Sequence, residues 1–335
     1  MAKFAYGVDL GWASQLEAQG YHWVNGKGEA VDPYEEAKNM GANAARFRVF
    51  VNPPKGAYWQ KRDGSVCMLG FCDIESVCEQ ARRAKAHGME IMIDLHYSDH
   101  FADPQYQEIP ADWLTDDEKT LCEKIKAHTL DVLTALKEAG ITPRWVQVGN
   151  EINPGILLPK GSLQEAPETL VKFLNAGYEA VKAFDEKILV VTHLAGAQMK
   201  DECESFLENF FAHDGKTDIL GFSYYPYWFG NVHRPEAVAE NLQRYHRVYQ
   251  KPVLIAEIGE AAKEEEKTYR IIRDIVAIMK EISGEEESGV FYWEPEVSGD
   301  EVVDGYPLGA SRMIGEKTLC YTKALEAYRD SEKTD

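Results

Sequence analysis

The chain has 335 residues, 44% of them hydrophobic and 27% charged, which is typical of a globular enzyme and enough to bury one large core or two modest ones. Its 56 acidic residues outnumber 36 basic ones, so the formal net charge is −20. Such a surface repels phosphate at range. No nucleic acid and no membrane is therefore expected as a partner, and a neutral substrate is favoured.

The first residues, MAKFAYGVDLG, enter an extended segment without the charged start and apolar run of a secretory signal. No apolar stretch is long enough to cross a bilayer. We therefore expect a cytoplasmic protein, although a secreted protein whose leader had been removed would begin in the same way.

The six cysteines show no C-x-x-C spacing, which favours free thiols over a zinc or redox motif. Cys67 with Cys72 is the pair to examine for a disulfide.

Short apolar segments rich in valine, isoleucine and tyrosine alternate with longer segments whose apolar residues recur every three or four positions. This alternation predicts parallel strands, buried on both faces and joined by helices. In chain order, the eight expected strands span residues 4–11, 44–51, 90–96, 145–151, 188–195, 219–226, 253–258 and 289–294.

Three of the intervening helices are especially clear. One runs from an acidic start at Asp73 to a glycine cap at Gly88, in the pattern that begins and ends helices. The other two, at 116–139 and 264–282, each carry an apolar stripe that would pack against the sheet.

Eight strand and helix units predict an α/β fold, a single (β/α)8 TIM barrel domain over residues 1–335, since such barrels need about 250 residues plus insertions. A doubly wound open sheet would need a G-x-G-x-x-G turn after an early strand to hold a cofactor, and the sequence has none there, so no cofactor is expected. Barrel active sites lie where the strands end. The long segments expected at that face are 12–32, 52–72, 97–114, 152–167 and 295–319, whereas 259–263 is brief.

Two glutamates close buried strands: Glu151 ends WVQVGNE and Glu257 ends PVLIAE. On the fourth and seventh strands of a barrel, both carboxylates would enter one pocket, which is the equipment for glycoside hydrolysis. A buried acid beside a second carboxylate has a raised pKa, which suits Glu151 as a proton donor. Glu257, held ionised by donors such as an arginine, would be the nucleophile. The alternative for each is a capping or salt-bridged carboxylate.

Further polar residues stand near the strand ends. Four acids are interpreted as hydrogen-bond partners for sugar hydroxyls or loop backbone: Asp94, Asp99, Glu260 and Glu294. His96 could be a metal ligand together with His193, but the additional histidines of such sites are lacking. No metal is therefore expected, and His96 is interpreted as a donor to a sugar hydroxyl.

Arg46 and Arg48 alternate onto one face of the second strand. Arginines inside a barrel are costly unless they meet carboxylates, so at least one should pair with Glu257. Aromatic rings, which pack on the C–H face of a pyranose, gather at the expected mouth. They are Trp12, Trp59, Tyr97, Trp113, Tyr224, Tyr225, Trp228 and Trp293.

Seven segments, in order over nearly the whole chain, carry a family resemblance: GVDLGWASQLEAQG, ARFRVFVNPP, IMIDLHYSDHFADPQYQEIPADW, WVQVGNEINPGILLPKG, ILGFSYYPYW, VLIAEIG and GVFYWEP. They resemble the glycoside hydrolase family 53 enzymes, the arabinogalactan endo-β-1,4-galactanases. The motifs DLHYSD, VQVGNEI and SYYPYW are fairly specific, whereas the Asn-Glu pair is shared with the wider clan A of retaining glycosidases.

The resemblance implies a (β/α)8 barrel that cleaves β-1,4-galactan or galacto-oligosaccharides by double displacement, with Glu151 as acid/base and Glu257 as nucleophile. It also implies that Asn150 contacts the sugar 2-hydroxyl and that Trp293 with His96 frames the cleaved sugar. Arg46 and a tyrosine, Tyr224 or Tyr225, would orient the nucleophile. The two carboxyl groups of retaining enzymes lie about 5–5.5 Å apart.

The chain departs from this family at Phe50, Phe101 and Leu158, where tryptophan is usual, so stacking subsites away from the cleavage point are expected to differ. The segment after the seventh strand is shorter than in bacterial members with a structural calcium, and that metal is not carried over. One alternative is a clan A retaining glycosidase acting on mannan or glucan. Another is a catalytically silent carbohydrate-binding barrel, which would be expected to lack one glutamate, Asn150 or Arg46.

Overall fold

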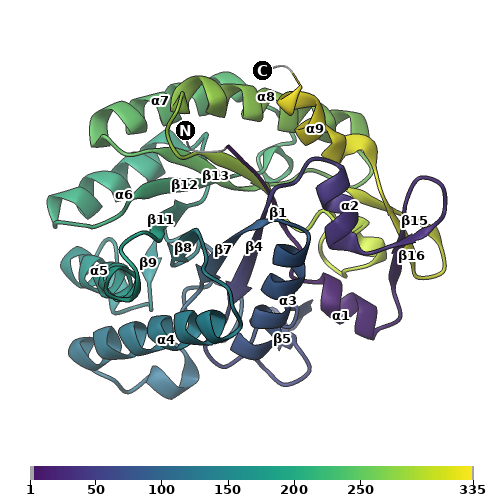
Figure 1. Cartoon of the computed structure of the whole chain (residues 1–335). Helices are drawn as coiled ribbons and strands as arrows, with labels where there is room; N and C mark the ends of the chain where they lie inside the picture. The colour runs from purple at the N-terminus through teal and green to yellow at the C-terminus, as the bar shows by residue number, and fades with distance from the viewer. Residues whose placement is uncertain (1–3, 334–335) are drawn as a thin grey trace.

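Eight parallel strands close into a barrel in the computed structural model, which describes residues 4–333 (Figure 1). In chain order they are β1 (Ala5–Asp9), β4 (Ala44–Val49), β7 (Glu90–Leu95), β8 (Trp145–Val148), β11 (Leu189–Leu194), β12 (Ile219–Tyr224), β13 (Val253–Ile258) and β14 (Gly289–Tyr292). Closure comes from β1, which pairs with β14 on one side and β4 on the other. The barrel predicted from the alternating pattern is confirmed.

All eight expected strands form, and seven of them end one to three residues earlier than predicted. The fourth, expected over 145–151, stops at Val148, because Gly149 and Glu151 both have positive φ, at 79° and 47°, and turn the chain out of the sheet. The sixth, expected over 219–226, stops at Tyr224 because a short 3-10 helix, Pro226–Trp228, follows.

Each barrel strand is followed by a helix of the outer ring, which surrounds the strands in Figure 1. These helices are α2 (Pro33–Asn39), α3 (Ile74–Ala86), α4 (Glu118–Glu138), α5 (Pro167–Phe184), α6 (Lys200–Ala212), α7 (Pro235–Tyr249), α8 (Glu265–Ser283) and α9 (Glu326–Glu332). At the start of α3, the Asp73 side chain accepts from the Ser76 N–H at 2.9 Å, as the acidic start predicts. No helix within residues 4–333 has the length and apolarity to span a membrane.

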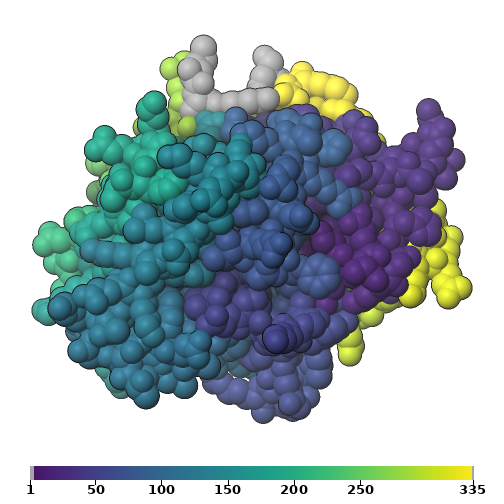
Figure 2. Space-filling view, turned by 60° about the horizontal axis from the view of Figure 1, so that its bottom comes forward, coloured from purple at the N-terminus to yellow at the C-terminus, as the bar shows by residue number. Residues whose placement is uncertain are grey.

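Additions to the barrel sit in its long connecting segments. A four-stranded sheet joins β2 (His22–Val24) and β3 (Ala30–Val31) to β15 (Ser311–Gly315) and β16 (Thr318–Tyr321), so segments from the two ends of the chain meet at one edge of the molecule (Figure 2). The other additions are α1 (Ala13–Ala18), the hairpin of β5 (Tyr58–Gln60) and β6 (Val66–Met68), the pair β9 (Gly155–Ile156) and β10 (Gly161–Ser162), and 3-10 turns at Ala111–Trp113, Gly299–Glu301 and Lys323–Leu325. All six cysteines are free thiols.

An apolar floor fills the barrel at the starting ends of its strands. Trp145 and Phe291 pack edge to face with ring centroids 6.0 Å apart, among small and branched residues such as Ala44 and Val191. A Cβ on Gly7 would lie 2.0 Å from the Phe291 ring, so only glycine fits there. Since this floor is closed, inward polar side chains two residues further along the strands face the opposite, carboxyl end.

Candidate active site

A cleft of about 580 Å³ opens at the carboxyl ends of the strands. Its centre is lined by polar residues, among them His96, Asn150, Glu151, Ser223, Tyr225 and Glu257. The two glutamates, 106 positions apart in the chain (257 − 151), therefore share one cavity, as a barrel requires of strands four and seven.

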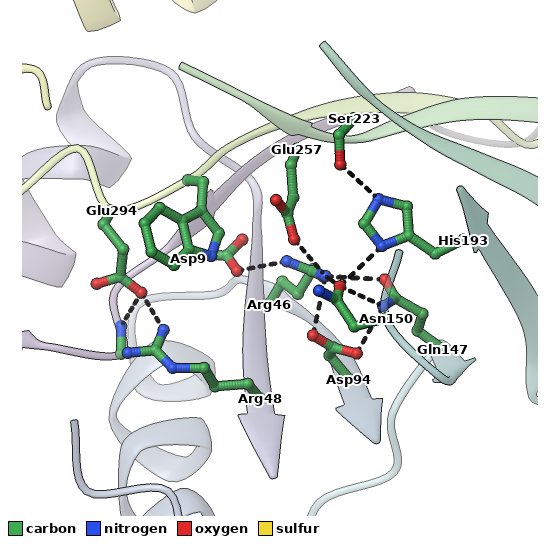
Figure 3. A network of polar contacts seen from close by, with 12 residues as sticks. Asp9, Arg46, Arg48, Asp94, Gln147, Asn150, His193, Ser223, Glu257 and Glu294 are labelled. Atoms are coloured by element: carbon green, nitrogen blue, oxygen red, sulfur yellow. Dashed lines mark hydrogen bonds and ion pairs between the residues drawn. The ribbon is translucent and has the colours of Figure 1, made fainter. Parts of the chain in front are cut away.

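Arg46, on β4, organises the polar layer beneath the cleft (Figure 3). Its guanidinium lies 2.7 Å from an Asp9 oxygen, 2.9 Å from an Asp94 oxygen and 3.0 Å from a Glu257 oxygen. Gln147 accepts from the same guanidinium at 3.0–3.1 Å. Such a buried arginine is stabilised only because carboxylates and amide oxygens satisfy its donors.

Both carboxylate oxygens of Glu257 receive a donor. Arg46 Nη2 donates to Oε1 at 3.0 Å and the Tyr225 hydroxyl donates to Oε2 at 2.7 Å. Burial, and then the charge of Glu257, raise the pKa of Tyr225 well above its ordinary value, so the phenol keeps its proton and remains a donor. Two such hydrogen bonds stabilise the ionised form of Glu257 and fix its direction.

Glu151 has a contrasting environment. It lies three residues beyond the end of β8 and is half-buried in the cleft wall. Its backbone is left-handed, and the Gln107 side-chain amide holds this turn by donating to the carbonyls of Asn150 and Glu151. Burial, followed by the charge of Glu257, raises the pKa of Glu151 well above its ordinary value. The cleft thus contains one carboxyl that retains its proton and one carboxylate held by two donors.

His96 lines the cleft, but both of its ring nitrogens are already engaged. The Ala102 backbone N–H donates to Nδ1 at 2.9 Å, so Nε2 carries the hydrogen and donates it to Asp94 at 2.8 Å. The expectation that His96 donates to a sugar hydroxyl is therefore wrong for this arrangement. Within residues 4–333, no three histidine, cysteine or acidic side chains converge as a metal site would require.

The four acids first interpreted as partners for sugar hydroxyls or loop backbone do not line the cleft, and all of them bind protein groups. Asp94 accepts from Arg46, and Asp99 accepts from the backbone at Asn52 and Ala111. Glu260 is buried against Lys267. The loop-backbone role matches Asp99 and Glu260, whereas Asp94 accepts from side chains only.

Glu294 is paired with Arg48 and accepts from the backbone N–H groups of Gly11 and Trp12 at 3.1 and 2.9 Å. The arginine that meets Glu257 is therefore Arg46, and Arg48 instead ties β4 to the segments after β1 and β14. The ion pair of Arg48 with Glu294 lies beside the network around Arg46 in Figure 3.

Aromatic rings line the cleft around the carboxyl groups. Trp12, Trp293 and Tyr306 contact one another edge to face, with centroids 4.9–5.1 Å apart. Trp59, from the β5–β6 hairpin, stacks on His100 at 3.9 Å, and Trp228 lies at the rim with 52% of its surface exposed. These surfaces suit the apolar faces of several linked sugars.

Three rings expected at the mouth lie elsewhere. The Tyr97 hydroxyl bonds Thr129 of α4 at 2.7 Å, and Trp113 is buried near His128 of the same helix. The Tyr224 hydroxyl points to His233 at 3.0 Å, so its neighbour, not Tyr224, contacts the nucleophile candidate. Successive residues of a strand point to opposite faces, which sends Tyr224 into the outer layer.

Sequence reasoning missed several cleft residues. Ser223 and Tyr306 line the cavity, while Asp9 and Gln147 lie beneath it. The inward positions of Asp9 and Gln147 follow from the period of two along their strands, which was a usable signal. Tyr306 lies in the long segment 295–319, whose length was the only indication of its role.

Two glutamates at the ends of the fourth and seventh strands of a closed barrel, one with a raised pKa and one held by two donors, are the arrangement typical of a glycoside hydrolase. The chain matches Glycosyl hydrolase family 53 over residues 5–328, and it belongs to that family.

Its relatives agree in sequence and structure. It is 30% identical over 331 residues to the arabinogalactan endo-β-1,4-galactanase of Cellvibrio japonicus, covering 87% of this chain and 80% of that protein. The family 53 catalytic domain of Ignisphaera aggregans superposes with a TM-score of 0.84 at 26% identity, covering 98% of this chain and 96% of that one. A solved fungal β-1,4-galactanase superposes with a TM-score of 0.81 at 24% identity, covering 98% and 99%.

Proposed function

We propose that this protein hydrolyses β-1,4-galactan or galacto-oligosaccharides with retention of configuration, using Glu151 as acid/base and Glu257 as nucleophile. The observation that carries the proposal is the unequal environment of two glutamates in one cleft. Burial and a neighbouring charge favour the protonated form of Glu151, whereas two donors hold the carboxylate of Glu257.

In the first step, a Glu257 oxygen attacks the anomeric carbon while Glu151 gives its proton to the departing glycosidic oxygen. The carbon–oxygen bond of the glycoside breaks as the ester bond to Glu257 forms. In the second step, Glu151 takes a proton from a water molecule, whose oxygen displaces Glu257 and releases the sugar. Arg46 and Tyr225 aim the nucleophile and stabilise it when it leaves.

Asn150 and the aromatic rings would position the sugar. The Asn150 amide nitrogen donates one hydrogen to the Ala102 carbonyl at 2.8 Å and has a second for the 2-hydroxyl of the cleaved sugar. Trp293, beside Trp12 and Tyr306, offers an apolar face, and Trp228 would bind a further unit at the rim. Asp94 and His96 support this layer from below by binding Arg46 and each other.

Galactan is favoured as the substrate by the family and by the named activity of relatives such as the Cellvibrio japonicus enzyme. A clan A glycosidase for mannan or glucan would share the same pair of glutamates. A silent binding barrel is disfavoured because all four residues are present: Arg46 contacts Asn150 and Glu257, and Glu151 lines the same cleft.

The test is hydrolysis of galactan, mannan and glucan oligosaccharides by the wild type, Glu151→Gln and Glu257→Gln. We expect the wild type to prefer galactan and each variant to lose turnover by orders of magnitude, since both substitutions remove charge chemistry and keep volume. Glu301→Gln, which changes a surface carboxylate 3.7 Å from Lys263, is the matched control. Retained turnover in either of the first two variants, or a preference for mannan or glucan, would overturn the corresponding part of the proposal.

A further inference from the structure

The hairpin of β5 and β6 presents one of its two faces to the cleft. Trp59 pairs with Cys67 across the hairpin, so their side chains leave it on the same side. Lys61 and Ser65 lie two positions further toward the tip, where the Lys61 N–H donates to the Ser65 carbonyl at 2.8 Å. Alternation along an extended chain places them on that side as well. All four residues line the cleft, which confirms the shared face.

One face of the Trp59 indole is covered by another ring of the protein. His100, in the segment after β7, stacks on it with centroids 3.9 Å apart and planes at 6°. Tyr106 stands at 87° to the indole, with centroids 4.9 Å apart, and lies 6.5 Å from the His100 centroid. Two neighbours at 3.9 and 4.9 Å would be about 6.3 Å apart at a right angle and about 8.8 Å apart on opposite faces. Tyr106 therefore meets the edge of the indole and leaves its second face uncovered.

The second face of Trp59 is turned toward the cleft. Trp59 lines the cavity, whereas His100 and Tyr106, which cover its first face and its edge, do not. The indole thus stands between His100 and the cavity, half-buried, with its open face on the cavity side. A flat ring backed by protein on one side and open on the other is suited to pack on the C–H face of a sugar.

The hairpin is fixed at its base and at its tip. At the base, Trp12 Nε1 donates to the Met68 carbonyl at 2.9 Å, and Trp12 also contacts Trp293 in the aromatic cluster of the cleft. At the tip, the Arg62 guanidinium lies over the Tyr106 ring, 4.8 Å from its centroid. A platform already held in place loses little conformational entropy when a ligand binds to it.

The platform lies apart from the two glutamates. The hairpin follows β4, which is two strands from β8 and three strands from β13 around the barrel. Glu151 follows β8 and Glu257 is on β13, so a sugar on Trp59 belongs to a part of the chain away from the cleavage point.

We propose that the cleft-facing side of the β5–β6 hairpin is a distal sugar-binding subsite, in which the open face of Trp59 packs on a galactosyl unit of a longer chain. This inference rests on the proposed function and deepens it by assigning the residue that favours long substrates. Galactose suits the platform, because its axial 4-oxygen lies on one face of the ring and leaves the C–H groups of C3, C4 and C5 on the other. Lys61 and Ser65, on the same side of the hairpin, offer donors for the hydroxyls of that unit.

The platform acts only on substrates that are long enough to reach it. Contacts with a remote unit stabilise the transition state relative to the free enzyme and substrate, so their loss lowers kcat/KM for long chains and leaves it unchanged for short ones. Exposing one face of an indole and of the sugar that it covers predicts a loss of about tenfold.

The experiment measures kcat/KM for galactan and for the shortest galacto-oligosaccharide that the wild type cleaves. In Trp59→Ala and Trp59→Leu, the ratio of the galactan value to the short-substrate value should fall about tenfold, while the short-substrate value stays within about threefold of wild type. Leucine keeps apolar volume without a flat ring, and this variant serves if alanine does not fold. An unchanged ratio in either variant would rule the platform out.

The next residue along the same strand provides a matched control. Tyr58 is 47% exposed, and its hydroxyl accepts from the Gln19 side chain at 2.9 Å on the other side of the hairpin. Tyr58→Ala removes an aromatic ring of similar size and should leave the ratio unchanged. The same fall in Tyr58→Ala as in Trp59→Ala would mean that the hairpin as a whole, and not the platform, had been disturbed, which contradicts the proposal.

A binding measurement that needs no turnover gives a second readout. In the Glu257→Gln background, calorimetric titration with a long galacto-oligosaccharide should show a Kd about tenfold higher when Trp59→Ala is added, and an equal Kd would contradict the platform. If the wild type hydrolyses galactan while the Trp59 variants keep the ratio, only the subsite is wrong. If the wild type prefers mannan or glucan, or hydrolyses none of the three glycans, the proposed function is wrong, and the galactosyl subsite falls with it.

Discussion

Replacing Tyr225 with phenylalanine removes one oxygen atom from the site and nothing else. The lost contact is a 2.7 Å hydrogen bond from the phenol to Glu257 Oε2, in a buried setting. Hydrogen bonds to charged groups contribute about 1.5–3 kcal/mol. Since each 1.36 kcal/mol is tenfold in rate, kcat/KM should fall by about 10- to 150-fold if the bond is needed to aim and stabilise the nucleophile.

The adjacent residue provides a matched control. Tyr224→Phe removes the same atom from the same kind of side chain, but that hydroxyl binds His233 at 3.0 Å and the Arg234 N–H at 2.7 Å, away from the cleft. We expect kcat/KM on galactan to stay within about threefold of wild type, since the lost hydroxyl does not contact the reacting groups. Equal losses in both variants, or full turnover in Tyr225→Phe, would refute the orientation argument.

Three further predictions concern the core and the pH profile. Glu294→Gln leaves the guanidinium of Arg48 buried without a counter-charge, and urea unfolding should show a loss of about 3–5 kcal/mol, whereas a loss below about 1 kcal/mol would contradict this. Gly7→Ala forces a methyl group into the ring 2.0 Å away and should lower the unfolding free energy by about 1–3 kcal/mol or more, whereas Gly26→Ala, with nothing within 4 Å, should not. The raised pKa of Glu151 predicts that kcat/KM for galactan persists above the pH at which an ordinary glutamate ionises and then declines. A decline already centred at the ordinary value would count against that assignment.

The period-two rule explains why part of the site could be predicted. Arg46 and Glu257 lie on regular strands, so their inward direction and their contact follow once the barrel is accepted. Glu151 is different, because its strand ends at Val148 and two left-handed residues set its direction. Periodicity placed it at the right edge of the barrel but could not supply the turn.

Residues in connecting segments were harder to assign. Tyr97 follows a strand as His96 does, yet it packs against α4, because adjacent positions point to opposite sides. Tyr306 contacts Trp293 only after about a dozen residues of loop have folded back, and no local pattern encodes that path. The inner layer of the site was therefore more predictable than its walls.

The charges of the polar layer explain why the protonated partner must be Glu151. Arg46 already faces three carboxyl groups, and Arg48 is occupied by Glu294. Burial raises the pKa of Asp9 more strongly than Arg46 lowers it, which relieves part of the excess negative charge. His193 is neutral and adds no cation. If Glu151 were ionised beside Glu257, no positive charge would be left to pair with it. The protonated form of Glu151 is therefore favoured over the ionised form until a leaving oxygen takes the proton.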